Sequence, residues 1–265
     1  MQISRISSQV PQVAGVGRDR DQARSLPAAV PSLPVGERAR LMQLASANQS
    51  QRWNPAAGWA AARNAHVTNT VDELTAALNG AFNYLEGDVR SIDRIPVMRH
   101  GSADRVDMQL ADWLAIGRVS GRGLKLDIKE QAAILPSVLL AREAGIDGGH
   151  LIINVSMSTD PIILMNVRQI YPGATVNLSP SDSLAPAVRE QLKRAAAITR
   201  GPVMFPLRVD LVTQEVINDL AGHGAIAIWN DPGIPGVVDV AALTRKLRDM
   251  GVDGMIDLRP SKRGA

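Results

Sequence analysis

Two short apolar segments carry charged side chains at every second position. LEGDV at 85–89 contains Glu86 and Asp88, and LKLDIK at 124–129 contains Lys125, Asp127 and Lys129. Alternate residues of a β-strand point to the same face, so each set should share one side of its strand. Burying so many charges is costly unless they are paired or bind a metal. The spacing therefore predicts two strands that meet at an active site.

Two of the four histidines flank the first segment, His66 before it and His100 after it in PVMRHG. The chain has no cysteine, which excludes disulfides, thiol catalysis and thiolate-bound zinc. Oxygen ligands from Glu86, Asp88 and Asp127 suit a divalent cation, Mg²⁺ or Ca²⁺. The two imidazoles could act as general base and general acid near neutral pH. A duller interpretation is that the same acids are structural groups paired with nearby lysines.

The composition indicates a soluble globular protein. The chain has 265 residues, of which 45% are hydrophobic, enough to bury a full core, and its sequence contains no apolar run of membrane-spanning length. The net charge is only +3, and two Phe and two Tyr offer little base stacking, so no nucleic-acid partner is expected. We infer no obligate protein partner.

Residues 1–50 have a different character from the rest. They are rich in Ser, Gln, Pro and Arg, and only residues 36–47 could form a short helix. We expect a flexible N-terminal arm over 1–50 and the folded domain over 51–265. The arm lacks the apolar core of a secretory signal peptide and resembles, by composition alone, the leader of a bacterial type III effector. Secretion into a host cell is one expectation, and a cytoplasmic location is the other.

From residue 59 onward, short apolar segments alternate with amphipathic ones. Eight such β/α units predict a single (β/α)8 TIM barrel, since no glycine-rich phosphate loop follows the first strand to favour an open doubly wound sheet. Thr70, Asp160 and Thr213 are predicted helix N-caps. The expected strands are 60–65, 84–89, 124–128, 151–155, 175–178, 203–209, 225–229 and 254–258.

Barrel enzymes bind their substrates at the carboxyl ends of the strands. The strands of this chain end in polar residues that should gather at one rim, and the cations among them would balance an anionic substrate such as a phosphate. Trp229 could stack on a sugar or simply close the barrel mouth. The later strand ends are Asn154, Asn177, Arg208, Trp229 and Asp257.

Several motifs resemble those of a known superfamily. HVTNT at 66–70, LEGDV, PVMRHG at 96–101, LKLDIKE, WND at 229–231 and GVDGMIDLRP at 251–260 are similar to motifs of glycerophosphodiester phosphodiesterases, TIM barrels related to phosphatidylinositol-specific phospholipase C. Within that superfamily, AHVTNTVDELTAAL, GLKLDIK and MFPLRVDLV are more similar to the menorin family. The resemblance covers most of residues 60–260.

The resemblance implies roles for particular residues. His66 and His100 would be the catalytic acid and base, and Glu86, Asp88 and Asp127 would hold the metal. From their own chemistry and their place at the strand ends, we expect five further residues to bind the substrate and its phosphate: Lys125, Lys129, Arg208, Asn154 and Trp229. The expected activity is hydrolysis of a small or headgroup phosphodiester, in which a neighbouring substrate hydroxyl attacks the phosphate, the leaving oxygen is protonated, and water then opens any cyclic product.

The chain also departs from the superfamily pattern. Val67 follows His66 where the hydrolases usually have a phosphate-gripping arginine, and the segment between His100 and Leu124 is too short for their glycerol-pocket subdomain. Two alternatives therefore stay open. One is a transferase that joins a sugar hydroxyl to a phosphoryl group, and the other is a binding barrel that acts as a secreted effector without chemistry.

Overall fold

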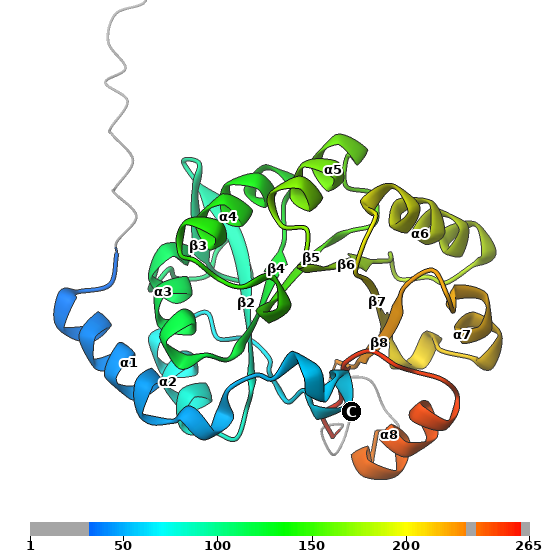
Figure 1. Cartoon of the computed structure of the whole chain (residues 1–265), viewed down its shortest axis with the longest axis horizontal. Helices are drawn as coiled ribbons and strands as arrows, with labels where there is room; N and C mark the ends of the chain where they lie inside the picture. Colours follow the sequence, from blue (N-terminus) through cyan, green and yellow to red (C-terminus); the bar gives the residue numbers. More distant parts are fainter. Residues whose placement is uncertain (1–31, 232–236, 261–265) are drawn as a thin grey trace, which may run out of the picture.

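The strands of the chain form one sheet that curves into a nearly closed barrel, with helices outside it (Figure 1). The computed structural model describes residues 32–231 and 237–260. Eight strands are parallel in the order β1-β2-β4-β5-β6-β7-β8-β9, and β3 pairs antiparallel with β2. The TIM-barrel prediction is therefore confirmed. The strands are β1 (Asn64–Ala65), β2 (Tyr84–Ile92), β3 (Ile95–Met98), β4 (Gly123–Ile128), β5 (Leu151–Ser156), β6 (Thr175–Ser179), β7 (Val203–Arg208), β8 (Ala225–Trp229) and β9 (Ile256–Asp257).

The helices begin where the sequence offers side-chain caps. Thr70 and Glu73 form a reciprocal capping box at the start of α2, and Asp160 and Thr213 cap α5 and α7. Among the described residues, no helix combines the length and apolar character needed to cross a membrane. The helices are α1 (Val35–Ala47), α2 (Val71–Asn79), α3 (Leu110–Ser120), α4 (Gln131–Glu143), α5 (Pro161–Ile170), α6 (Pro186–Thr199), α7 (Gln214–Leu220) and α8 (Val240–Asp249).

Helix α1 packs on the outside of α3 and α2 (Figure 1). Leu41 and Ala45 are buried in this contact, and the backbone N–H of Leu33 donates to Asp112 in α3 at 2.9 Å. Residues 35–47 thus form a packed helix inside the segment expected to be a flexible arm, because an apolar pair one turn apart matches the face of α3. Residues 1–31 of that arm lie outside the described residues.

An aromatic cluster fills the end of the barrel opposite the carboxyl ends of the strands. Trp53 stacks on Trp59 at 5.6 Å between ring centroids, and Tyr84 meets Trp53 edge-on at 5.0 Å. Trp59 belongs to a 3₁₀ turn over Trp59–Ala61, so the first strand is shorter than the expected 60–65. The backbone forms a turn here instead of a strand, and the two indole rings cover this end of the barrel.

Strand register brings the charged residues of β2 and β4 side by side. Glu86 lies next to Lys125, and Asp88 lies next to Asp127. Asp127 in turn neighbours Asn154 of β5. Since paired residues of adjacent strands point to the same face, the polar rows of three strands meet inside the barrel.

Side chains bridge the seam between the first and last strands of the barrel. In the described part of the chain, β1 pairs only with β2, and β9 pairs only with β8. Asn64 of β1 donates from Nδ2 to Oδ2 of Asp257 in β9 at 2.8 Å. Contacts between polar side chains therefore join the seam where a backbone ladder would complete a closed barrel.

Candidate active site

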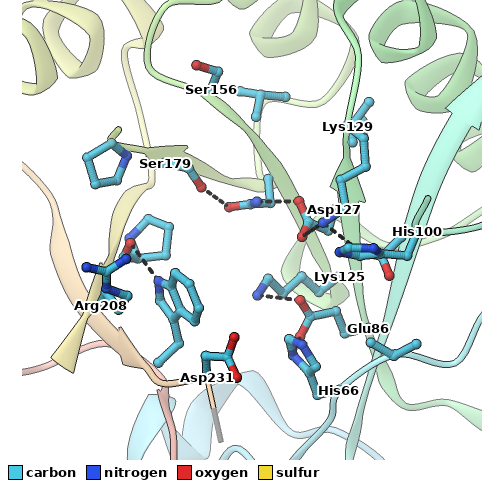
Figure 2. Close-up of a pocket in the computed structure, with 18 of the residues that line it drawn as sticks. His66, Glu86, His100, Lys125, Asp127, Lys129, Ser156, Ser179, Arg208 and Asp231 are labelled. Atoms are coloured by element: carbon cyan, nitrogen blue, oxygen red, sulfur yellow. Dashed lines mark hydrogen bonds and ion pairs between the residues drawn. The ribbon is translucent and has the colours of Figure 1, made fainter. Parts of the chain in front are cut away.

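A cavity of about 720 Å³ opens at the carboxyl ends of the parallel strands. All ten residues predicted from the sequence to form the site line this one cavity (Figure 2). Their arrangement follows from the strand register, while their individual roles stay predictions. The ten are His66, Glu86, Asp88, His100, Lys125, Asp127, Lys129, Asn154, Arg208 and Trp229.

The His66 ring is held on one side by two carboxylates. Its Nδ1 lies 3.0 Å from Oε2 of Glu86 and 3.5 Å from Oδ2 of Asp257. Burial lowers the pKa of this imidazole, but hydrogen bonds to Asp257 and Glu86 outweigh burial and raise the pKa to about 9. The other ring nitrogen, Nε2, has no hydrogen-bond partner among the described residues. His66 is thus an imidazolium at neutral pH with one N–H available to the cavity.

Glu86 and Lys125 form a buried ion pair. Nζ of Lys125 lies 2.9 Å from Oε1 of Glu86, and the Glu86 side chain is only 2% exposed. Burial would raise the pKa of Glu86, yet Lys125 and His66 hold it well below its usual range. Burial likewise opposes the charge on Lys125, whose pKa is nevertheless raised to about 12, chiefly by Glu86 and Asp127. Both groups therefore stay charged.

Lys129 joins the two remaining acids of the expected metal triad. Its Nζ lies 2.7 Å from Oδ1 of Asp88 and 2.6 Å from Oδ2 of Asp127. Asn154 donates to the other oxygen of Asp127 at 2.7 Å, and Ser179 donates to Asn154 at 3.0 Å. The Lys129 ammonium group thus lies between Asp88 and Asp127 and pairs with both carboxylates.

His100 approaches the cavity from the segment after β3. Its side chain is exposed, and among the described residues no hydrogen bond holds its ring. Its backbone carbonyl accepts a hydrogen bond from Nε of Arg90 at 2.6 Å, which fixes the main chain. Figure 2 shows the ring on the same side of the cavity as Lys129 and Asp127. The His100 ring is therefore accessible to solvent and to a bound ligand.

The loop after β1 is tied tightly to β2. Thr68 donates both its N–H and its hydroxyl to the carbonyl of Glu86 at 2.8 Å, and Trp113 donates to Thr68 at 3.0 Å. Asn69 clasps Asp88 through two hydrogen bonds of 2.7 Å each. Val67 takes a left-handed backbone conformation, with φ of 62°, which is costly for a β-branched residue. These contacts hold His66 in place against that strain.

On the other side of the cavity, Arg208 is already paired. Its guanidinium binds Asp210 through two bonds of 2.7 and 3.1 Å and lies 3.3 Å from Asp182. The hydrogen bonds to Asp210 also raise the pKa of Arg208. Trp229 lies beside it, 36% exposed, with its indole N–H donating to the carbonyl of Pro206 at 3.3 Å. The expected phosphate-binding role of Arg208 must compete with these carboxylates.

Three asparagine and aspartate residues complete the site without having been assigned a role from the sequence. From the sequence, Asp257 was identified only as the end of a strand. Asn64 donates a hydrogen bond to Asp257, and Asn69 donates one to Asp88. Asn64 also donates to Glu86. The HVTN spacing after β1 could have indicated Asn69, since position 69 follows His66 closely at the same strand end. Asn177, by contrast, is buried and does not line the cavity.

One group of side chains among the described residues has ligand atoms close enough to hold a metal ion, and it shares Glu86 with the expected set. Ligand atoms of His66, Glu86 and Asp257 lie within 4.8 Å of one another. The expected set of Glu86, Asp88 and Asp127 does not come as close together in the described residues. Lysine ammonium groups pair with all three carboxylates, which is the arrangement that the structural interpretation of these acids predicts. A metal on Nδ1 of His66 must displace a proton, because the pKa of this imidazole is raised, whereas the pKa of the Glu86 carboxyl is lowered.

Comparisons with known proteins agree with this architecture. Residues 59–162 match the model of the menorin N-terminal domain, which supports the menorin resemblance over that part of the chain. A solved structure from Galdieria sulphuraria, assigned as a glycerophosphodiester phosphodiesterase, is 12% identical with a TM-score of 0.52, covering 75% of this chain and 91% of its own. A glycerophosphoryl diester phosphodiesterase from Parabacteroides distasonis is 14% identical with a TM-score of 0.51, covering 87% and 90%. At such identities the likeness shows the shared fold.

Proposed function

We propose that the chain hydrolyses a small or headgroup phosphodiester, with His66 and His100 as general acid and base. One observation carries the proposal most directly. Glu86 and Asp257 hold Nδ1 of His66, which leaves Nε2 facing a cavity shared with two lysines and a second histidine. The same arrangement orients and charges an imidazole in other acid–base sites. The phosphodiesterase fold neighbours support this activity class.

The two histidines have different surroundings and therefore different roles. His66 is protonated at neutral pH, so its Nε2–H can protonate the leaving oxygen as the P–O bond breaks. His100, exposed to solvent, accepts the proton of the attacking hydroxyl, from water or from the substrate itself. Each turnover thus moves one proton onto His100 and one off His66, and solvent exchange restores both.

The lysines can bind the phosphoryl oxygens without leaving their acids. A lysine ammonium has three N–H donors. Lys125 uses one of them on Glu86, and Lys129 uses two on Asp88 and Asp127. Three donors remain for substrate, and they stabilise the negative charge that gathers on the phosphoryl oxygens.

A divalent cation is part of the proposal. Glu86, Asp88 and Asp127 would hold it, since their charged oxygens suit Mg²⁺ or Ca²⁺. When bound, the ion would supply further positive charge to the phosphoryl oxygens. Lys125 and Lys129 pair with these carboxylates, so a bound ion would compete with both ammonium groups.

Transfer to a sugar or polyol hydroxyl is a second candidate. The cavity extends well beyond the charged residues, toward Ser156 and Trp229, and leaves space for an acceptor molecule. The acceptor hydroxyl would then replace water, and a new phosphodiester would form. Product analysis by ³¹P NMR with and without a sugar acceptor distinguishes hydrolysis from transfer.

The proposed activity is tested with bis(p-nitrophenyl) phosphate and a panel of glycerophosphodiesters. We expect His66→Gln and His100→Gln each to lower kcat/KM at least a hundredfold, in line with losing a general acid or base. His150→Gln and His223→Gln are matched controls because neither residue lines the cavity. Equal activity in all four variants, with unchanged circular dichroism, would refute the assignment.

A further inference from the structure

The cavity has two walls of different chemistry. The strands β1, β2 and β4 supply the charged wall with His66, Glu86 and the lysines. The wall opposite comes from the ends of β5 to β8 and the residues after them. We call it the hydroxyl–indole wall and define it as Ser156, Pro180, Ser179, Ser181, Pro206 and Trp229. Figure 2 shows Ser156 and Ser179 across the cavity from Lys125 and Glu86.

Basic and acidic side chains are equal in number beside the hydroxyl–indole wall. Two basic residues, Arg208 and Arg259, line the cavity near it together with two acidic ones, Asp182 and Asp231. Arg208 is held by Asp210 and Asp182, and the guanidinium of Arg259 donates to the carbonyl of Asn230 at 3.1 Å. The six residues of the wall itself are uncharged, which favours a neutral group on this side and leaves the phosphate to Lys125 and Lys129.

The groups of this wall suit a ligand with many hydroxyls. Ser156 and Ser179 lie side by side at the ends of β5 and β6, and Ser179 uses its proton on Asn154, which leaves its oxygen free to accept. Trp229 is fixed in orientation by Pro206 and keeps part of its ring exposed. An indole face covers the apolar C–H face of a sugar ring, while hydroxyls bind its rim.

We propose that the hydroxyl–indole wall binds a neutral polyhydroxylated group, a sugar or cyclic polyol, attached to the phosphate of the substrate. This inference rests on the proposed phosphodiesterase function and names its substrate class. Trp229 is the specificity-determining residue, since its ring gives a flat apolar surface that glycerol is too small to cover. The sugar can come from a soluble phosphodiester or from a lipid headgroup.

Binding is tested first without any reaction. Methyl glucoside, inositol and glycerol are titrated separately into the full chain with saturating inorganic phosphate, and tryptophan fluorescence and ligand-observed NMR report binding. We expect the two ring compounds to bind at least tenfold tighter than glycerol. Trp229→Ala should remove that preference, and Trp229→Phe should restore part of it, which excludes misfolding as the cause. Trp59→Phe is the control, since Trp59 lies outside the cavity lining.

A second experiment separates this inference from the proposed function. Rates are compared for bis(p-nitrophenyl) phosphate, soluble glycerophosphoinositol, and phosphatidylinositol in vesicles. A lower KM for either inositol compound than for the nitrophenyl ester supports the inference if Trp229→Ala raises that KM at least tenfold. The compound with the lower KM identifies the source of the sugar. Hydrolysis of the nitrophenyl ester alone, or equal binding of glycerol and the ring compounds, overturns the inference. Ring-compound binding with no hydrolysis of any ester leaves the wall assigned and refutes the phosphodiesterase.

Discussion

The imidazole of His66 gains its charge from residues that are distant in sequence. Glu86 is contributed by the neighbouring strand and Asp257 by the last strand of the barrel. Because the pKa of His66 is raised to about 9, the ring keeps its proton below about pH 9 and loses it as the pH rises through that value. The charged form, and its contribution to folding stability, should therefore be complete below the ordinary histidine pKa.

Replacing Asp257 by Asn should lower the pKa of His66. One of the two carboxylates that favour the imidazolium is removed, while Glu86 remains. In metal-free protein, NMR titration of the ring protons should give a midpoint near 9 for the wild type and a clearly lower one for the variant. A wild-type midpoint near the ordinary histidine value would contradict the hydrogen bonds described for Nδ1.

Cation binding should depend on the carboxylates rather than on His66. We expect calorimetry with Mg²⁺ and Ca²⁺ to detect binding that Glu86→Gln abolishes and that Asp88→Asn or Asp127→Asn weakens at least tenfold. Asp257→Asn should change affinity much less, because Asp257 belongs only to the alternative group with His66. If Asp257→Asn is as damaging as Asp127→Asn, the ion sits at the His66 group instead, and His66 cannot then be the acid.

The site could be predicted well from single strands and less well from contacts between them. Glu86, Asp88, Lys125 and Lys129 follow from a period of two on apolar segments, which needs no tertiary information. The role of Asn64 could not be predicted, because its partners come from β2 and β9. The pairing of Arg208 with Asp210 was equally hidden, since a guanidinium at a strand end also suits phosphate.

At the scale of elements, the strands were the most predictable features. The strands β7 and β8 are nearly continuous apolar runs because both faces of a parallel barrel sheet are buried, whereas β2 and β4 alternate apolar and charged residues. The first and last strands are shorter than predicted: 60–65 was expected for the first, which spans Asn64–Ala65, and 254–258 for the last. The 3₁₀ turn at Trp59 replaces the start of β1, and β9 spans only Ile256–Asp257. The start of β1 is set by the packing of Trp53, Trp59 and Tyr84, and local sequence patterns do not indicate such packing.

Gly123 allows β4 to lie against the aromatic cluster. A Cβ atom at this position would come within 2.1 Å of the Tyr84 ring, which is fully buried. We expect Gly123→Ala to reduce the free energy of unfolding by about 1–3 kcal/mol through overpacking. Urea denaturation followed by circular dichroism measures the change.

Gly36 provides the matched control for that substitution. It lies in α1, where an added Cβ meets nothing within 4 Å. Gly36→Ala should raise stability by about 0.5–1 kcal/mol, since alanine is the better helix former. If both alanine variants shift stability equally, the Tyr84 contact is not the cause.

At the scale of the whole molecule, the folded body begins before residue 50. Leu41 is completely buried between α1 and the barrel helices, whereas Val35 of the same helix is 87% exposed. The sequence did not indicate this contact, because α1 has only a weak apolar face, and its role is seen only from its packing against α3.

Leu41→Ala should therefore destabilise the protein by about 2–5 kcal/mol, the range for truncating a buried leucine. Val35→Ala should change stability by less than about 0.5 kcal/mol, as for other exposed positions. Thermal and urea unfolding of the full chain measure both. A small effect of Leu41→Ala would mean that α1 is dispensable and that the domain starts near residue 51.

The bridge across the barrel seam has a consequence for how the protein matures in the cell. Asn64 and Asp257 are 193 positions apart, so their hydrogen bond can form only after nearly all of the barrel has left the ribosome. The His66 ring is exposed to the nascent chain's surroundings long before its second carboxylate partner exists. The site should therefore become complete in a single step late in synthesis, when Asp257 joins the barrel. Chains that stall before residue 257 should carry both histidines yet remain inactive.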